Sequence, residues 1–465
     1  MGRLNRPRNK LHPPRSYATS SCYKTEGILL GQAEPERVGK STKGRMPLMK
    51  KPERKCKFVV VSLISLFVLN IMSLSSAMAA TYYVSPTGSD GNSGSQNNPW
   101  ANVEYAARKA KPGDTIFVRG GTYQEGEVWL RAKFGHGGAQ GKLLTIKAYP
   151  NEIPVFINSR RPFIIDCDYI RIEGLHFKNG KSIRLGGNTV QIVNNTFTGS
   201  GYGWAAVLAE GTNILLEGNK CDINGNVVGT QGHCYYIGHG SNITIRNNMA
   251  KGMTGYGIHV FDERRKGDRP DFERLIKNVT IEGNVVSHSE KRSGIILAAH
   301  DHARIEDVIV MNNVAFNNPD AGIYTRGIVS NVKIYNNTLF GNGETALLIY
   351  GATRDITNVE IKNNIFDLTN SNSNAYHVFN KEENTSLVLQ NNLYWPKPVR
   401  LKKLSDSSPV IGNPHFVNPR EKDFHLLPGS AAIDKGIPLS DVSHDKDGIK
   451  RPQGTAFDLG AFEFH

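Results

Sequence analysis

The chain has 465 residues and a formal net charge of +14. Most of the positive excess is local, because residues 1–57 carry 15 basic and 4 acidic residues whereas the remainder carries 41 and 38. The nearly neutral body argues against a nucleic-acid-binding surface. A chain of this length ordinarily forms two or three domains, unless it consists of repeats that extend one core lengthwise.

Residues 1–80 are predicted to be an N-terminal extension followed by a signal peptide. Three basic residues precede the apolar run 58–72, and residues 76–80 end in the small side chains that signal peptidase accepts. A membrane anchor is the alternative for this apolar run. We expect cleavage near Ala80 and a secreted, periplasmic or extracellular protein that keeps no membrane segment.

The mature chain is predicted to open with a cap and first coils over residues 81–160. Residues 82–84 form a short apolar strand before a loop rich in Gly, Asn and Ser. Residues 101–110 place alanines on one face of a short helix. A single amphipathic helix before a run of strands suits a solenoid, because the open end of its first coil must be covered.

One motif then recurs through residues 161–400. It is an apolar–x–apolar triplet, one further residue and a pair that ends in Asn. Its eight instances end at Asn195, Asn219, Asn248, Asn284, Asn313, Asn337, Asn364 and Asn392. The spacings between these asparagines are 24, 29, 36, 29, 24, 27 and 28 residues.

The motif favours a parallel β-helix. The triplet has a period of two, as in a short strand. Asn tolerates the left-handed conformation of a sharp bend, and asparagines repeated at one corner can hydrogen-bond up the stack. Helical repeats are excluded because no stretch keeps a 3.6-residue period, and propeller blades need longer four-strand units. The fold class is therefore all-β, a solenoid with a short capping helix, and residues 401–465 form its C-terminal cap.

A second strand follows each Asn turn. If the middle residue of each triplet points outward, successive coils add one residue to a column about every 4.8 Å. This predicted outward column reads Val207, Tyr236, His259, Ile296, Tyr324 and Leu348. Three cysteines remain after cleavage, Cys167, Cys221 and Cys234, and their uneven spacing predicts buried packing residues rather than a disulfide framework.

The chain resembles the pectate lyase-like right-handed parallel β-helix superfamily. The resemblance rests on the Asn-ended repeats, on residues 82–94 and 111–123 at the start, and on the terminal segment 457–463. It implies a right-handed coil and action on polysaccharide, and the superfamily also contains hydrolases, epimerases and proteins of other roles. The Asp-Pro-His signature of the mannuronan epimerases is missing from this sequence.

Candidate catalytic residues gather around the longest repeat, where 10 of the 13 residues from 262 to 274 are charged. A lyase that acts on a uronic acid needs a base for the C5 proton, cations that neutralise the carboxylate, and an acid for the leaving O4. The base candidates are His259, Lys266, Arg264 and Arg265. Tyr324 would protonate the leaving oxygen, and Arg326 would bind the carboxylate through two hydrogen bonds.

Substrate contacts are predicted from His233, Tyr236, His239, His300 and His302. Calcium is the one cofactor considered, with Asp262 and Asp301 as ligand candidates and Asp268 and Asp271 as further ones, although no run matches a known calcium-loop spacing. The expected partner is an extracellular polysaccharide, with no nucleic acid and no membrane, and the protein is expected to be a monomer.

Three functions remain open from the sequence. The first is a lyase that cleaves acidic polysaccharide by β-elimination. The second is a non-catalytic carbohydrate-binding or cell-surface solenoid that uses Tyr236, His259 and Tyr324 as a stacking platform. The third is a glycoside hydrolase, which needs two carboxylates about 5–10 Å apart, here Asp262 and Asp301.

Overall fold

The structure is a computed structural model that describes residues 78–465, except 125, 158–162, 181, 200–204, 224–230, 264–273, 301–302, 353 and 403. The predicted extension and all but the last three residues of the predicted signal peptide lie outside the described residues. Within the described residues, no helix is long and apolar enough to cross a membrane.

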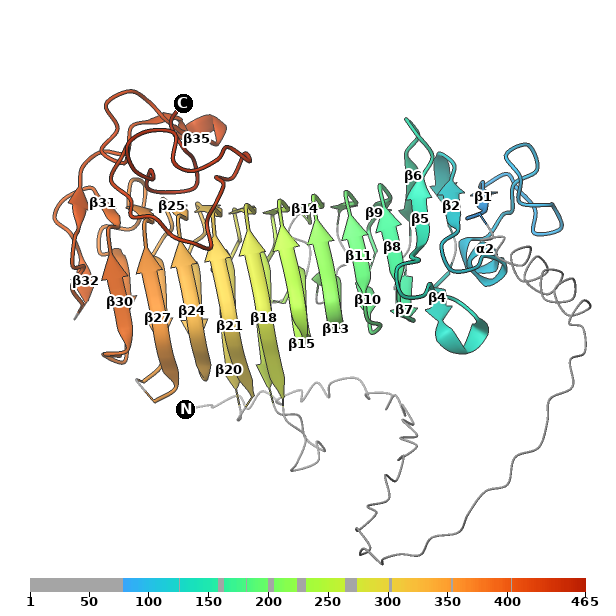
Figure 1. The fold of residues 1–465 in the computed structure, drawn as a ribbon, viewed down its shortest axis with the longest axis horizontal. Coiled ribbons are helices and arrows are strands. Elements are labelled where there is room, and N and C mark those ends of the chain that lie inside the picture. The colour runs from blue at the N-terminus through green and yellow to red at the C-terminus, as the bar shows by residue number, and fades with distance from the viewer. Residues whose placement is uncertain are drawn as a thin grey trace, which may run out of the picture. The chain divides into compact units, whose positions relative to one another are not determined.

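The fold is a parallel β-helix whose coils stack side by side along one axis (Figure 1). Each coil contributes strands to three faces. The first, which we call the repeat face, begins with β1 (Thr81–Val84), β2 (Thr115–Val118), β5 (Leu144–Ala148) and β8 (Ile170–Glu173) of the first coils. It then carries the motif strands β11 (Val190–Val193), β18 (Leu275–Glu282), β21 (Arg304–Met311), β24 (Val329–Tyr335), β27 (Ile356–Lys362) and β30 (Leu387–Gln390).

The second face, which we call the histidine face, carries His259. Its strands are β4 (Val128–Arg131), β7 (Phe163–Asp166), β10 (Ile183–Leu185), β17 (Ile258–Glu263), β20 (Ile295–His300), β23 (Ala321–Arg326), β26 (Thr345–Tyr350), β29 (Tyr376–Asn380) and β32 (Leu401–Lys402). Two long strands bend from this face to the repeat face, β13 (Ala205–Glu217) and β15 (His233–Arg246).

The third face is a separate sheet of short parallel strands. They are β3 (Gly121–Tyr123), β6 (Pro154–Ile157), β9 (His176–Lys178), β12 (Thr196–Thr198), β14 (Lys220–Asp222), β16 (Met249–Lys251), β19 (Val285–Ser287), β22 (Val314–Phe316), β25 (Thr338–Phe340), β28 (Ile365–Asp367), β31 (Leu393–Trp395) and β33 (Val410–Ile411). The inward residues of all three faces fill one continuous apolar core.

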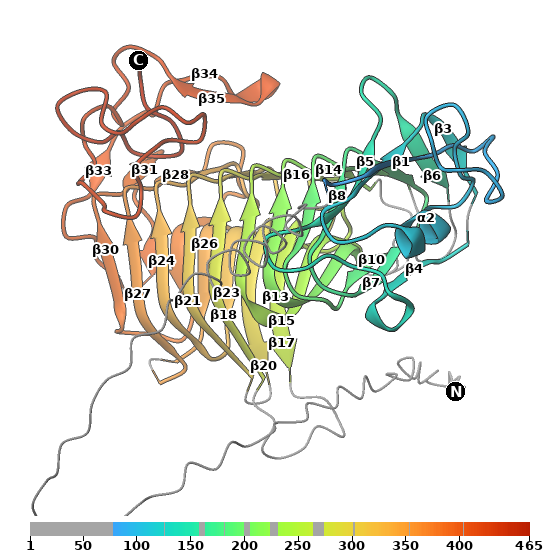
Figure 2. The ribbon, with the colours of Figure 1, turned by 45° about the vertical axis from the view of Figure 1, so that its right-hand side comes forward.

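Helix α2 (Val103–Lys109) covers the N-terminal end of the solenoid and buries Val103, Ala106 and Ala107 over the first coils, which confirms the predicted capping helix. The C-terminal segment, for which we keep the name C-terminal cap, packs along the side of several coils, where Phe416 and Phe424 lie against Phe340. Within it, β34 (Phe416–Asn418) and β35 (Asp423–Leu426) form an antiparallel pair, visible in Figure 2. Buried Arg451 ties this segment to the coils, because it pairs with Glu463 and donates to the Oδ1 atom of Asn312.

The buried asparagines form a continuous hydrogen-bonded ladder. Asn337 Oδ1 accepts from the backbone N–H and the Nδ2 of Asn313, both at 3.0 Å. Its own Nδ2 donates to Val310 O at 2.8 Å and to Asn364 Oδ1 at 3.0 Å. All eight final asparagines are at most 2% exposed. The predicted stacking of these side chains is confirmed.

The two predicted roles of the corner asparagine fall on different residues. The left-handed conformation belongs to the residue before each ladder asparagine, with φ between 49° and 64°. That residue is Asn in six coils and Gly at positions 218 and 283. Both types adopt positive φ at low cost, so the first residue of each pair makes the bend and the second forms the ladder.

We expect Asn337→Ala to lower the free energy of unfolding by about 2–4 kcal/mol, because it leaves buried amide and carbonyl groups of three coils without partners. Thermal and denaturant unfolding followed by circular dichroism measures the change. Val388→Ala is the control, since Val388 is 51% exposed on the repeat face and its truncation should change stability by less than about 0.5 kcal/mol. Equal effects of the two substitutions would contradict a stabilising ladder.

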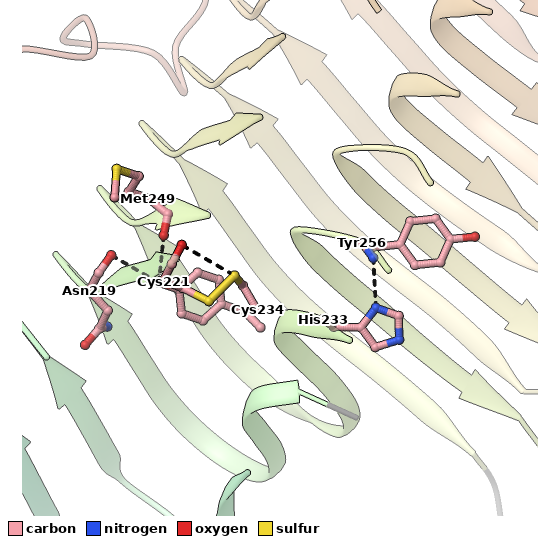
Figure 3. The surroundings of a disulfide bond; sticks show 7 residues. Asn219, Cys221, His233, Cys234, Met249 and Tyr256 are labelled. Atoms are coloured by element: carbon pink, nitrogen blue, oxygen red, sulfur yellow. Dashed lines mark hydrogen bonds between the residues drawn. A yellow bond between two sulfur atoms is a disulfide. The ribbon is translucent and has the colours of Figure 1, made fainter. Parts of the chain in front are cut away.

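The cysteine prediction was wrong for two of the three residues. Cys221 at the centre of β14 and Cys234 at the start of β15 form a disulfide, 13 residues apart in sequence (Figure 3). Cys167 is buried and free, as expected. The spacing rule failed because a disulfide within a single coil needs only two cysteines that neighbouring faces bring together, not an even framework.

A Cys221→Ala/Cys234→Ala double variant should be less stable by about 3 kcal/mol, because the cross-link closes a short loop that is otherwise free in the unfolded chain. A reductant should destabilise the wild-type protein and Cys167→Ala equally and leave the double variant unchanged. A reductant that has no effect on the melting temperature of the wild-type protein would contradict the disulfide.

Candidate functional site

The outward column of the histidine face follows the predicted register over five coils. Tyr236 pairs with His259, and the next strands add Ile296, Tyr324 and Leu348 in succession. Parallel strands are about 4.8 Å apart, so His259 and Tyr324, two steps apart, lie about 10 Å from each other across Ile296.

The prediction was wrong for Val207, the first member of the column. Val207 is fully buried in the core, and its neighbour Leu208 pairs with Tyr236. The segment 205–209 is apolar throughout, so it contains no polar residue that could set the phase of the alternation.

His259 is hydrogen-bonded to a second buried histidine. Nδ1 of His259 lies 3.2 Å from Nε2 of His233. Nδ1 of His233 in turn accepts the backbone N–H of Tyr256 at 2.9 Å (Figure 3). The rings of Tyr236, Tyr256 and Phe261 lie within 5.0 Å of the His259 ring, centroid to centroid. His259 thus sits in an aromatic enclosure and is only 8% exposed.

This enclosure keeps both histidines neutral. Burial lowers the pKa of His233 to about 3, with a smaller contribution from the positive charge of Arg292. Burial also holds the pKa of His259 well below its usual value, and the neighbouring His233, Arg292 and His300 lower this pKa further. At neutral pH the pair therefore carries no net charge.

The hydrogen bonds also fix which nitrogen carries each proton. Because Nδ1 of His233 accepts from the backbone of Tyr256, the proton of neutral His233 is on Nε2 and is donated to Nδ1 of His259. The proton of His259 is then on its own Nε2. No described residue accepts a hydrogen bond from this Nε2–H group, so it can donate to a ligand.

Two further predicted residues lie on the same face two coils away. Burial raises the pKa of the Tyr324 hydroxyl to about 12, so this group is protonated at neutral pH. Arg326 follows two residues later on β23, is exposed, and lies over the ring of Tyr350 at 5.1 Å. The structure therefore brings a protonated hydroxyl and a guanidinium onto one strand.

Sequence reasoning missed Tyr256 and Arg292. Both precede outward strands of the histidine face, and the Arg292 guanidinium lies 6.0 Å from the Tyr256 ring. Its charge acts on both histidines. The signal that could have found them is their position three or four residues before the column residue of their coil. His233, at the start of β15, stands three residues before Tyr236 in the same way.

Asp262 is not available as an open metal ligand. Its side chain is 1% exposed and lies 3.2 Å from Nδ1 of His239 and 3.6 Å from a guanidinium nitrogen of Arg274. His239 therefore pairs with Asp262. Within the described ranges, no group of three or more His, Cys, Asp or Glu side chains could hold a metal ion.

Several predicted residues lie outside the described residues. They are Arg264, Arg265, Lys266, Asp268, Asp271, Asp301 and His302. His300 is described, at the end of β20, where its ring lies 5.3 Å from that of Phe261. The predicted stacking platform is not an open surface, because Tyr236, His259 and Tyr324 are each at most 8% exposed.

Comparison with known proteins identifies the family. Residues 82–364 match the model of the Pel9A-like right-handed β-helix region. The chain belongs to this family. Its coil is therefore right-handed, as the superfamily resemblance implied.

The similar proteins have low sequence identity to this chain, and one solved structure shares its fold. Pectate lyase L of Paenibacillus polymyxa (strain SC2) is 25% identical over 57% of this chain and 64% of that protein. The uncharacterised protein YwoF of Bacillus subtilis (strain 168) is 33% identical over 29% of this chain and 27% of that protein. The chain thus matches less than two thirds of the length of each relative. The crystal structure of pectate lyase Pel9A has 19% identity and a TM-score of 0.61 over 84% of this chain and 97% of that one.

Imidazole NMR tests the state of the histidine pair. The pKa of His233 is lower in the folded protein than the usual value near 6.5, so its ring should stay neutral, with Nε2 protonated, from pH 7 to about pH 4. The folded state then binds fewer protons than the unfolded state, and stability should decrease as the pH falls from about 6.5 toward 3.

His425 in the C-terminal cap is the internal control. Burial lowers its pKa, but hydrogen bonds to Asp423 and Asp447 outweigh burial, and the net shift is upward. Its resonance should titrate above pH 6.5 in the same spectra. Titration of His233 near pH 6.5 would contradict the claim that burial lowers its pKa.

Proposed function

We propose that the protein is a polysaccharide lyase that cleaves an acidic glycan by β-elimination on the histidine face. The observation that carries the proposal is the neutral His233–His259 pair, whose outer Nε2–H group lies on the same face as Tyr324 and Arg326. Family membership supports it, because the member that names the family is a pectate lyase.

In this proposal a uronate ring binds on the histidine face with its carboxylate at the exposed Arg326 and its C4 and C5 atoms directed toward Tyr324 and His259. Arg326 pairs with the carboxylate and neutralises it, which makes the C5 proton acidic. The Nε2–H group of His259 donates to the carboxylate oxygen on which charge develops as that proton leaves. A neutral imidazole acts in this way without releasing a proton of its own.

Tyr324 then supplies the proton for the leaving O4. Its raised pKa keeps the hydroxyl protonated until the bond breaks, which is the state a general acid needs. A base, for which Lys266, Arg264 and Arg265 are the predicted candidates, accepts the C5 proton. The C5–H and C4–O bonds break, a C4–C5 double bond forms and O4 leaves with the proton of Tyr324, so the product carries an unsaturated uronate end.

The hydrogen bonds favour a donor role for His259 over the base role predicted from sequence. Its Nδ1 accepts from His233 and its Nε2 carries the proton, so neither nitrogen can accept the C5 proton. Lys266, Arg264 and Arg265 stay as base predictions outside the described residues. Calcium also stays a prediction, and no step here depends on it. The paired and buried state of Asp262 gives no support to a hydrolase with Asp262 and Asp301 as its carboxylates.

The proposed substrate is an extracellular polysaccharide, and the proposed location is outside the cytoplasm. The Cys221–Cys234 disulfide supports this location, because disulfides persist in oxidising compartments. The monomeric state predicted from sequence stays a prediction.

The test is the ultraviolet absorbance of unsaturated uronate ends, measured with purified residues 81–465 on pectate, alginate and chondroitin, with and without calcium. We expect absorbance to rise with at least one substrate. His259→Ala should lower kcat about 100-fold, as loss of one donor to a developing oxyanion does. His259→Gln, whose amide can still donate, should keep at least about one tenth of the activity.

His444→Ala is the control, since His444 is exposed in the C-terminal cap and should leave turnover unchanged. Equal loss in His259→Ala and His259→Gln would contradict the donor role and favour a base. A flat trace on every substrate, with glycan still retained by the protein, would replace the lyase with a binding solenoid.

A further inference from the structure

A polar groove lies on the repeat face, away from the histidine face that carries His259. Its volume is about 520 Å³, and its floor is formed by β15, β18, β21 and β24. Asp441 of the C-terminal cap forms one wall and pairs with Lys333 at 2.8 Å. A cavity of this size is within the range of small-molecule sites.

An exposed asparagine ladder runs along the edge of this groove. Asn278 Nδ2 donates to Asn242 Oδ1 at 3.0 Å, and Asn242 donates in the same way to the preceding coil. Farther along, Asn331 Nδ2 donates to Asp307 Oδ1 at 2.8 Å. Each rung therefore donates to the coil before it and accepts from the coil after it.

Asp307 interrupts the ladder. A carboxylate has no amide to donate, so Oδ1 of Asn278 receives no hydrogen bond from the described residues, although it faces the next rung about 4.8 Å away. The second oxygen of Asp307 lies 3.4 Å from Nζ of Lys277. The groove thus presents two adjacent acceptors. Oδ1 of Asn278 has no donor among the described residues, and the Asp307 carboxylate, which already contacts Asn331 Nδ2 and Lys277 Nζ, has further lone pairs that can accept.

The floor beside this break combines apolar and polar side chains. Ile309 is half-buried and lies in register between Thr280 and Lys333. A sugar ring has the complementary surfaces, because its C–H face packs on an aliphatic side chain while neighbouring hydroxyls donate to paired acceptors. Lys277 and Lys333 balance Asp307 and Asp441, so the groove has no net charge that would favour a simple ion.

We propose that this groove is an ancillary polysaccharide-binding site, in which two neighbouring hydroxyls of one sugar unit donate to Asn278 Oδ1 and Asp307, and the ring packs on Ile309. The site goes beyond the proposed lyase activity and does not depend on it.

Asp307→Asn tests the site with nearly the same shape. Asn tolerates the left-handed φ of 57° at this position, and its new amide should donate to Asn278 and close the ladder. Retardation of the purified protein in gels that contain polygalacturonate measures binding. We expect the apparent affinity to fall about five- to tenfold, as the loss of one or two hydrogen-bond acceptors implies.

Asn213→Asp is the matched control, because it adds a carboxylate to the same ladder outside the groove and keeps the acceptor that Asn242 uses. It should bind polygalacturonate as the wild type does. Both variants should melt within about 1 °C of the wild type and cleave short oligogalacturonates at its rate, since the histidine face is unchanged.

Wild-type retardation in Asp307→Asn, or no retardation of the wild-type protein itself, would overturn the ancillary site. The two proposals fail separately. Loss of retardation in Asp307→Asn without any unsaturated product would support the groove and reject the lyase, whereas cleavage with unaltered retardation would do the reverse.

Discussion

The buried asparagine ladder is the interaction on which the register of the coils depends. Each rung satisfies backbone groups of its own coil and of both neighbours, at a corner from which water is excluded. A slip of one residue would leave these groups unpaired and turn every inward side chain outward. The ladder therefore fixes which residues of distant coils become neighbours, and every column on the three faces follows from it.

The histidine face shows what this fixed register makes possible. Residues that are 23 to 37 positions apart in sequence meet as adjacent members of one column, and aromatic rings from successive coils close around His259. The enclosure has an electrostatic consequence, because it removes the solvent that would stabilise an imidazolium. The backbone N–H of Tyr256 then selects the tautomer. The His233–His259 pair is thus kept neutral. His233 is hydrogen-bonded to the backbone of Tyr256, and His259 can donate a hydrogen bond from Nε2.

A ladder of asparagine hydrogen bonds also forms at an exposed corner, where it contributes differently to the structure. The second ladder, at the edge of the repeat face, is in contact with water, so its rungs contribute less to stability and tolerate replacement. Asp307 interrupts it without disturbing the register of β18 and β21, which the buried ladder maintains. Because the exposed corner does not maintain the register, its side chains can serve as acceptors for a ligand. Asp441 of the C-terminal cap adds a wall beside the strands, so that they line a groove.

The sequence by itself determined the repeat, the parallel β-helix, the capping helix and most of the outward column. These follow from the two-residue period of the strands and from the tolerance of Asn for positive φ at bends, both of which recur in every coil. It did not determine the phase of the all-apolar segment at Val207, the Cys221–Cys234 bond, the pairing of Asp262 with Arg274, or the approach of Tyr256 and Arg292 to the histidines. Those depend on distances between loops of neighbouring coils, which no local pattern encodes. Only the tertiary structure decided that His259 is an enclosed donor, because its protonation and tautomer are set by groups contributed from other coils and turns.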